Sequence, residues 1–358
     1  MDKTTKRREK TRERLIRHYT TYSKLQIEDI FKYIFQSAFG CEHLVSSESA
    51  ALDYIKHEYE SSPKADMSVI DRLDGTYSRV HLSYLNEGLR AETLARLFCL
   101  SAKKEPDAKA LLEQGLEVAR QLIADGELPF ACEAFDTVLG EWRSQGYPAV
   151  HHSEAFQAAY RPAYRVIDNR YADFLQVFSK IDRLLSGGSA IVTIEGGSAS
   201  GKTTLAGILQ QVYDCNVFHM DDFFLRPEQR TPERFAEVGG NVDRERFLDE
   251  VVQPLKRNEA VRYRRFDCSN QALGEPIAVM PKKLTVVEGV YSMHPAFAEY
   301  YDLSVFLDID PEHQRKRILK RNTPQLAKRF FEEWIPLENW YFSQTQVKSR
   351  CSEAVMIE

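Results

Sequence analysis

The sequence lacks three features, each of which would indicate a particular class of protein. No apolar run approaches the ~20 residues that span a bilayer, and the first residues lack the apolar segment of a signal peptide. Six cysteines are scattered over 358 residues without a CxxC pair, which is typical of reduced thiols in a cytosolic protein. We therefore expect a cytoplasmic protein with no membrane segment.

The sequence also lacks a strong excess of either charge. The formal net charge is -5, which gives no general reason to expect a nucleic-acid partner. One basic segment, residues 3–17, holds eight Lys or Arg against two Glu. It is either an arm for nucleic acid or anionic lipid, or an exposed helix. Because Glu9 and Glu13 lie four residues apart, as on one helix face, we favour the exposed helix.

Hydrophobic periodicity divides the chain into two halves. Residues 27–38, 91–102 and 107–124 repeat apolar side chains at helical spacing, so residues 1–170 are predicted to form a mostly α-helical domain. No motif that we recognise indicates its role. His151, His152 and Glu154 are of metal-ligand type, but their spacing is not a known metal signature, so we favour satisfied or surface histidines.

The second half follows a different pattern. Residues 171–189 are predicted to be a linker helix that ends in a Gly/Ser turn. In residues 190–358, short β-rich runs alternate with helical ones, which predicts a parallel sheet with helices on both faces. The β-rich runs are residues 191–194, 217–219, 284–287 and 304–307. The predicted fold class is therefore α/β, preceded by the helical domain.

Residues 196–203 read GGSASGKT and match G-x-x-x-x-G-K-[ST] between a predicted strand and a predicted helix. Glycines let such a loop curl, so that its N–H groups and the helix start face a polyphosphate. The alternative is a Gly/Ser turn that only caps a helix, and the flanking strand and helix favour the phosphate loop. Lys202 is expected to reach the β- and γ-phosphates, and the Thr203 hydroxyl to bind Mg²⁺. The predicted nucleotide-binding residues are Gly196, Gly197, Ser198, Ala199, Ser200, Gly201, Lys202, Thr203 and Thr204.

Carboxylates follow two of the predicted strands, at the edge where open parallel sheets bind ligands. Glu288 ends the strand at 284–287 and is a candidate to assist Mg²⁺, with a helix-capping or surface role as the alternative. Asp221 and Asp222 follow the strand at 217–219, where one of them can take the proton from an attacking hydroxyl. We assign this base to Asp221 and leave Asp222 as the alternative. Asp221 is also a candidate metal ligand, together with Thr203 and Glu288.

A basic helix is predicted to begin at Asp310-Pro311, an N-cap residue followed by a proline in the first turn. Its cations can close over the transferring phosphate as a lid, or they can form an ordinary solvated face. The cations are Arg315, Lys316, Arg317, Lys320 and Arg321.

The order of these motifs resembles the uridine kinase-like branch of P-loop kinases, which includes phosphoribulokinase and bacterial pantothenate kinase. The resemblance rests on GGSASGKTT, MDDFF, RYRRFDC, TVVEGVYS and SVFLDIDPEHQRKRILKRN, and extends from about Ala190 to the C-terminus. It implies that Lys202 and Thr203 serve phosphate and Mg²⁺ and that Glu288 supports the metal. It also implies that Asp221 activates the acceptor, and that Arg317 and Arg321 belong to the lid.

The acceptor pocket departs from the pattern of uridine-phosphorylating relatives. Those relatives have a segment rich in His, Pro, Phe and Asp after the base and a His-Arg pair after the FD-containing strand. This chain has GGNVD at 239–243 and FDCSN at 266–270 instead. The candidate acceptor-binding residues, each with a structural role as the alternative, are Asn241, Asp243, Tyr263, Arg264 and Asp267.

These observations predict a phosphotransferase that uses ATP and Mg²⁺ and a small-molecule hydroxyl acceptor. Uridine or another nucleoside is the leading acceptor, and pantothenate, a sugar or glycerate are the alternatives. A nucleotide-gated regulator or scaffold with little catalysis is the competing hypothesis, because so much helical sequence has no assigned role. The sequence leaves open whether ATP or GTP is the donor. It also leaves open the oligomeric state, for which a homo-oligomer is one option.

Overall fold

The computed structural model describes residues 3–41, 44–45, 47–61, 70–73 and 75–357. By its internal contacts the chain divides into two compact units, Met1–Leu175 and Gln176–Glu358. The predicted division into residues 1–170, 171–189 and 190–358 stays a prediction. Helix α9 (Leu175–Gly187) lies in the predicted linker, yet its Asp182 accepts a hydrogen bond of 2.9 Å from Tyr213 of the C-terminal unit. This helix therefore packs as part of that unit.

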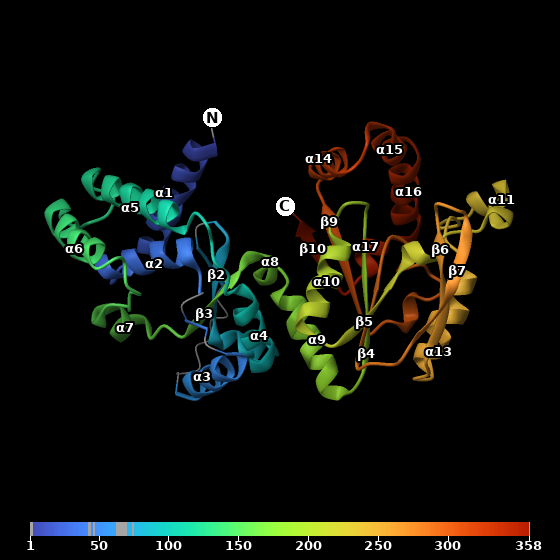
Figure 1. Ribbon diagram of the computed structural model, residues 1–358, viewed down its shortest axis with the longest axis horizontal. Coiled ribbons are helices and arrows are strands. Elements are labelled where there is room, and N and C mark those ends of the chain that lie inside the picture. Colours follow the sequence, from blue (N-terminus) through green and yellow to red (C-terminus); the bar gives the residue numbers. More distant parts are fainter. Residues whose placement is uncertain (1–2, 42–43, 46, 62–69, 74, 358) are drawn as a thin grey trace. The chain divides into compact units, whose positions relative to one another are not determined.

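The N-terminal unit is mostly helical, as predicted (Figure 1). It also contains a three-stranded antiparallel sheet that the sequence did not reveal. Its central strand pairs Tyr77 with Asp168, so the pairing joins residues far apart in the chain, and strands this short carry little periodicity of their own. The helices are α1 (Lys3–Thr21), α2 (Ile27–Phe39), α3 (Glu48–Ser61), α4 (Ala91–Ser101), α5 (Ala108–Ala124), α6 (Cys132–Ser144), α7 (Glu154–Tyr160) and α8 (Asn169–Ala172). The strands are β1 (Ile70–Arg72), β2 (Tyr77–His81) and β3 (Tyr164–Asp168).

Helix α2 is the centre of this unit because its apolar face is buried by other helices. Phe31 stacks on Trp142 of α6, with ring centroids 4.9 Å apart. Against α5 the approach is so close that a Cβ added at Gly115 would lie 2.6 Å from Ile34. The spacing that predicted a helix at 27–38 therefore also marks the side that packs in the core.

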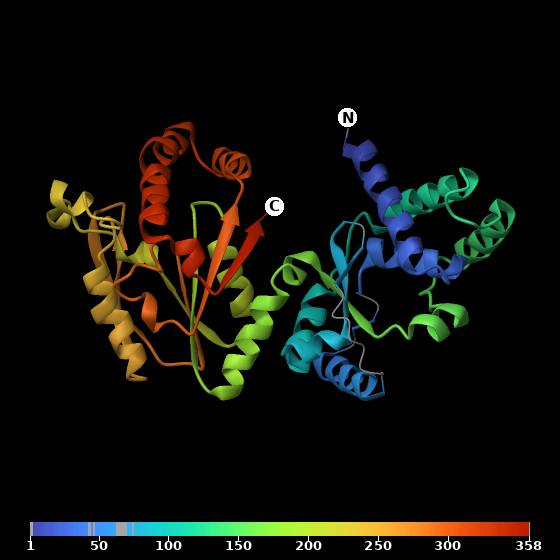
Figure 2. The same ribbon diagram turned by 180° about the vertical axis from the view of Figure 1, so that it is seen from behind.

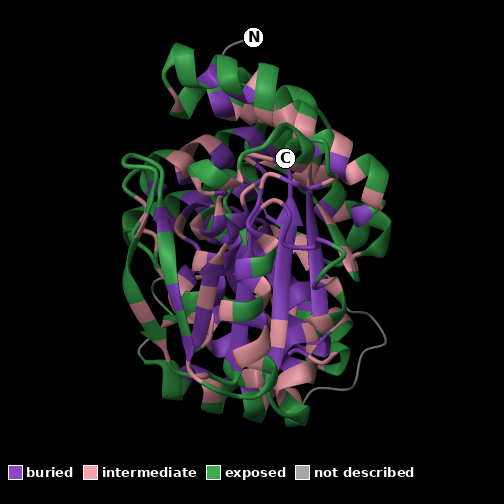
Figure 3. Cartoon of the chain, turned by 90° about the vertical axis from the view of Figure 1, so that its right-hand side faces the viewer, coloured by how far each residue is buried: buried purple, intermediate pink, exposed green. Residues whose placement is uncertain are grey.

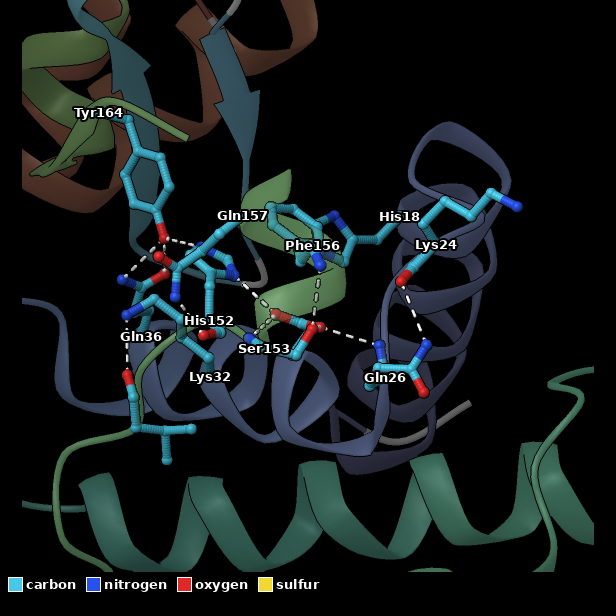
Figure 4. Close-up of polar contacts among 12 residues, drawn as sticks. His18, Lys24, Gln26, Lys32, Gln36, His152, Ser153, Phe156, Gln157 and Tyr164 are labelled. Carbon is cyan, nitrogen blue, oxygen red and sulfur yellow. Dashed lines mark hydrogen bonds and ion pairs between the residues drawn. The ribbon is translucent and has the colours of Figure 1, made fainter. Parts of the chain in front are cut away.

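A polar cluster lies beside that core (Figure 4). The fully buried Asp29 accepts hydrogen bonds from His152 Nδ1 at 2.8 Å, from the Ser153 hydroxyl at 2.6 Å and from the Gln26 amide at 2.8 Å. Burial, the largest influence, lowers the pKa of His152 to about 4, so the ring is neutral at pH 7. His152 Nε2 can then accept from the Tyr164 hydroxyl 2.7 Å away. His152 is thus held by hydrogen bonds within the unit.

Helix α1 carries the basic segment singled out in the sequence. Arg8 forms a salt bridge with Glu117 at 3.2 Å, and Arg12 forms one with Asp125 at 3.1 Å. Both partners belong to α5 or its C-terminal end. Part of the positive charge of α1 is therefore directed at a neighbouring helix of the same unit.

The C-terminal unit contains a five-stranded parallel sheet in the order β10-β9-β4-β8-β5. Helices lie on both sides of it (Figures 1 and 2), and its strands are largely buried (Figure 3). The predicted P-loop NTPase-type α/β fold is confirmed. The strands are β4 (Ala190–Gly196), β5 (Cys215–His219), β8 (Leu284–Glu288), β9 (Leu303–Ile309) and β10 (Glu353–Ile357), with a separate hairpin of β6 (Val261–Asp267) and β7 (Ala272–Val279).

The remaining helices connect these strands. After β9 the chain forms α14, ends that helix at Asn322, and begins α15 at the cap residue Thr323; a π-helical segment then joins α15 to α16. The helices are α10 (Lys202–Val212), α11 (Pro232–Phe235), α12 (Arg244–Phe247), α13 (Gln253–Lys256), α14 (Pro311–Arg321), α15 (Pro324–Arg329), α16 (Ile335–Thr345) and α17 (Val347–Arg350). The π-helical segments are η5 (Leu248–Val252) and η7 (Phe330–Trp334), and the 3-10 turn η3 (Met220–Phe223) follows β5.

The strand register decides which side chains meet. Glu288 pairs with Ile194 of β4 and with His219 of β5, and Gly196 pairs with Leu307 of β9. Because all these strands are parallel, their carboxyl ends reach the same edge. The loop at 196–203, Glu288 and the Asp221-Asp222 pair therefore lie at the same edge of the sheet.

Candidate functional site

The loop between β4 and α10 has the curled backbone that its glycines predicted. Gly196 has φ 145° and Gly201 has φ 102°, which favour glycine. A Cβ added at Gly196 would lie 2.5 Å from the Leu307 carbonyl oxygen, so β9 leaves no room for a side chain there. The loop is therefore packed against the neighbouring strand and opens directly into the N-terminus of α10.

Lys202 spans the inside of this loop. Its Nζ donates to the carbonyl oxygens of Gly196 at 2.8 Å and Gly197 at 2.9 Å, and the residue is buried. The ammonium is therefore held against the first two residues of the loop. The predicted contact with β- and γ-phosphates stays a prediction.

Thr203, Glu288 and His219 form a connected group beside the loop. The Thr203 hydroxyl donates to Glu288 Oε1 at 3.0 Å, and His219 Nδ1 lies 2.6 Å from the same oxygen. The hydrogen bond to Glu288 is the main reason why the pKa of His219 is raised. Sequence reasoning assigned no role to His219, although its place at the end of the predicted strand at 217–219 was an available signal.

The two candidate bases differ in their contacts. Asp222 is held by Arg265 Nε at 3.3 Å and by the Tyr263 hydroxyl at 3.4 Å. The carboxylate of Asp221 has no hydrogen bond within the described residues. Asp221 is exposed at its surface, but partial desolvation by surrounding protein atoms, and after it the negative charge of Glu288, raise the pKa of Asp221. Asp221 is therefore the carboxylate that is available to a ligand.

The predicted basic helix, α14, begins as expected. The Asp310 side chain accepts from the amides of Glu312 at 2.9 Å and His313 at 3.1 Å, which caps the helix. Arg317 Nη1 donates to the Ala199 carbonyl oxygen at 3.2 Å, so this predicted lid residue contacts the loop. Arg321 instead lies over the Phe330 ring, 5.4 Å from its centroid, and is exposed.

The proposed acceptor residues are not all gathered in one place. Tyr263 contacts Asp222, as above, and Asn241 hydrogen-bonds to Tyr291. Asp243 is buried and caps α12 by accepting from the Arg246 amide, which is a structural role. The remaining two, Arg264 and Asp267, are exposed on the β6–β7 hairpin, where Asp267 accepts from Ser269 in the turn.

Two buried carboxylates that the sequence did not single out also contact the loop. Glu195 accepts hydrogen bonds from the amides of Gly196 at 2.8 Å and Met293 at 3.1 Å. Burial raises its pKa to about 7. Glu338 of α16 accepts from the Ser198 amide at 2.8 Å. Nothing local in the sequence around Glu338 indicates this contact, because 140 residues separate it from Ser198.

Comparison with known proteins agrees with these motifs. Residues 191–325 match the family model of the Phosphoribulokinase / Uridine kinase family. The chain is 29% identical over 140 residues to a uridine kinase of Chlamydia pneumoniae, covering 37% of this chain and 61% of that protein. It is 26% identical to a uridine kinase of Staphylococcus haemolyticus, covering 38% of this chain and 70% of that protein. The resemblance of the C-terminal half to uridine kinase-like P-loop kinases is therefore confirmed.

Other similarities are more partial. Uridine kinase-like protein 3 of Arabidopsis thaliana is 26% identical, and this chain spans only 30% of its length. A solved structure of a possible uridine kinase from Bacillus stearothermophilus is 21% identical, with a TM-score of 0.38, covering 50% of this chain and 98% of that chain.

Within the described residues, no helix combines the length and apolar character needed to cross a membrane.

Proposed function

We propose that this chain transfers the γ-phosphate of ATP, in the presence of Mg²⁺, to a hydroxyl group of a small metabolite. One observation carries the proposal: the register of β4, β5 and β8 brings the phosphate loop, the Thr203–Glu288 pair and Asp221 to one edge of the sheet. Phosphoryl transfer depends on positioning and on charge stabilisation, and these are the groups that it uses. Similarity to uridine kinases supports the same class of reaction.

The side chains present fit a magnesium nucleotide. Thr203 and Glu288 offer a hydroxyl and a carboxylate oxygen, the ligand type that Mg²⁺ prefers. Asp221 is the further candidate ligand. When bound, the ion would neutralise charge that develops on the phosphates. Lys202 and the loop amides would hold the phosphate chain, and Arg317 would bring a second cation to the same loop.

Asp221 would position the acceptor hydroxyl and take its proton. A general base works best when its pKa lies close to the working pH, and the pKa of Asp221 is raised in that direction by desolvation and by Glu288. Asp222 is less suited, because Arg265 and Tyr263 already hold its carboxylate. We therefore keep Asp221 as the proposed base.

For the acceptor, uridine or another nucleoside is the leading candidate. A non-nucleoside acceptor is the second candidate, because the segments at 239–243 and 266–270 differ from those of uridine-phosphorylating relatives. The exposed guanidinium of Arg265 beside Asp222 would suit an acceptor that carries polar or anionic groups.

The proposal is tested by measuring acceptor-dependent ADP release with MgATP against a panel of nucleosides, pantothenate, glycerate and sugars. At least one compound is expected to be phosphorylated. Asp221→Asn should then lower kcat at least a hundredfold while the affinity for ATP stays within a few-fold. Asp214→Asn, at an exposed carboxylate that pairs with Lys282, is the matched control. If no compound is turned over while ATP still binds, the nucleotide-gated regulator becomes the better interpretation.

A further inference from the structure

Helices α14 and α16 both form hydrogen bonds with one residue of the phosphate loop, Ser198. The Ser198 amide donates to Glu338 Oε2 at 2.8 Å, and its hydroxyl donates to Glu338 Oε1. Gln314 of α14 donates from Nε2 to the Ser198 carbonyl oxygen at 2.8 Å. The amide, the hydroxyl and the carbonyl of Ser198 are therefore all bonded to the segment between α14 and α16. A Cβ added at the adjacent Gly197 would lie 3.1 Å from Gln314 and 3.6 Å from Glu338, so the contact is closely packed.

The Glu338 carboxylate uses a donor of the kind that binds nucleotide phosphates. Backbone N–H groups of a loop that leads into a helix N-terminus bind phosphate oxygens, because several donors converge on one anion. A carboxylate resembles a phosphate group because it offers two acceptor oxygens and a negative charge. Burial raises the pKa of Glu338, the hydrogen bonds from Ser198 lower it, and Lys202 and Asp221 are among the charges that act on it. The carboxylate thus lies within the group of residues proposed to surround the transferred phosphate.

We propose that Glu338 is a built-in competitor for the phosphate chain of the nucleotide and thereby determines the affinity for the phosphate donor. A triphosphate that takes the Ser198 amide must displace the carboxylate, since two anions so close together repel each other strongly in a partly buried site. This inference rests on the proposed function, because it requires a loop that binds nucleotide.

Displacement of Glu338 would remove one of the contacts that hold α16 beside the loop. The helix would keep another, because the buried Tyr341 of α16 donates to Glu195 Oε2 at 3.3 Å. Gln314 and Arg317 separately attach α14 to the loop. The expected change on nucleotide binding is therefore local to the Ser198 contact.

The test is the dissociation constant for MgATP, measured by calorimetry on the full chain. Glu338→Gln keeps the shape of the side chain and removes its charge, and it is expected to bind MgATP about tenfold more tightly than the wild type. Glu338→Ala is expected to change the affinity in the same direction. Glu332→Gln, at an exposed carboxylate that pairs with Lys328 in the same lid, is the matched control and should leave the affinity unchanged. Thermal unfolding without nucleotide checks that each variant is folded.

The outcomes separate the two proposals. Tighter binding by both Glu338 variants supports the competitor. If the wild type binds MgATP and both variants bind it equally or more weakly, the competitor is wrong while the proposed function stands. If neither the wild type nor any folded variant binds a magnesium triphosphate, the proposed function is wrong and the competitor falls with it.

Discussion

Asp29 in the N-terminal unit and Asp221 in the C-terminal unit are both carboxylates among other polar groups, but their surroundings differ. Asp29 accepts hydrogen bonds from Gln26, His152 and Ser153, and these bonds outweigh the effect of burial, so that its pKa is lowered. Asp221 has no hydrogen bond within the described residues, and its pKa is raised. A carboxylate whose oxygens are already bonded maintains the fold, whereas one without such bonds can accept a proton from a ligand. A polar cluster alone therefore does not mark a functional site.

The largest expected effect concerns the nucleotide site. Lys202→Ala should lower kcat/KM on the order of a thousandfold, which is about 4 kcal/mol of transition-state stabilisation, because the charge that the loop holds for the phosphates is lost. The measurement is the steady-state rate with the acceptor that the panel identifies. Lys282→Ala, at an exposed lysine paired with Asp214, should have normal activity. Activity of Lys202→Ala within tenfold of the wild type would contradict the proposed nucleotide site.

The next largest effect concerns the polar cluster around Asp29 in the N-terminal unit. Asp29→Ala should destabilise the N-terminal unit by about 3 kcal/mol, because three residues that donate to the carboxylate lose their acceptor in a buried place. Hydrogen exchange of the amides in α2 and α7 reports on this unit alone. Asp53→Ala, at an exposed residue of α3, is the control. Asp29 would be more than a structural residue if the variant kept its stability and lost activity.

Glu195 predicts a pH dependence. Its pKa is raised from the usual 4.5 to about 7 by burial, so the folded protein binds this proton more tightly than the unfolded chain. The stabilisation is complete below about pH 4.5 and is lost as the pH rises through about 7. Between pH 5.5 and 8 the wild type should lose about 2 kcal/mol more stability than Glu195→Gln does. Urea unfolding at the two pH values measures this difference, and equal losses would mean that Glu195 does not titrate in this range.

The smallest effect compares the two lid arginines. Arg317 contacts the loop through the Ala199 carbonyl, whereas Arg321 lies over Phe330. Arg317→Met should lower kcat about tenfold, which is about 1.4 kcal/mol, and Arg321→Met should lower it less. Single-turnover rates with saturating MgATP measure both. A larger loss for Arg321→Met would indicate that the lid closes in a different position when the reaction occurs.

Much of the C-terminal unit was predictable, because its signals are local. The loop at 196–203 is defined by consecutive residues between a strand and a helix, and the four predicted strands are β4, β5, β8 and β9. The helix that Asp310 and Pro311 begin is likewise encoded by neighbouring side chains. In the N-terminal unit, the helical periods were visible for the same reason.

The acceptor residues were harder to predict. Asp243 and Asp267 are polar residues in the right region, and the sequence cannot distinguish a carboxylate that caps a helix or stabilises a turn from one that faces a ligand. In the structure, the Asp243 side chain caps α12, and the Asp267 side chain accepts a hydrogen bond in the β6–β7 turn. Their assignment as acceptor ligands stays a prediction with a competing structural role.

The sequence by itself determined the glycine-rich loop at 196–203, the alternation of strands and helices, and the types of side chain at the sheet edge. Each of these features depends on residues only a few positions apart, because the backbone geometry of loops, strands and helices determines which neighbouring side chains share a face. Only the tertiary structure decided that His219 bonds to Glu288, that Glu338 reaches Ser198 across 140 residues, and that β2 pairs with β3. Such contacts join residues far apart in the chain, so they follow from how the elements pack and not from any local pattern.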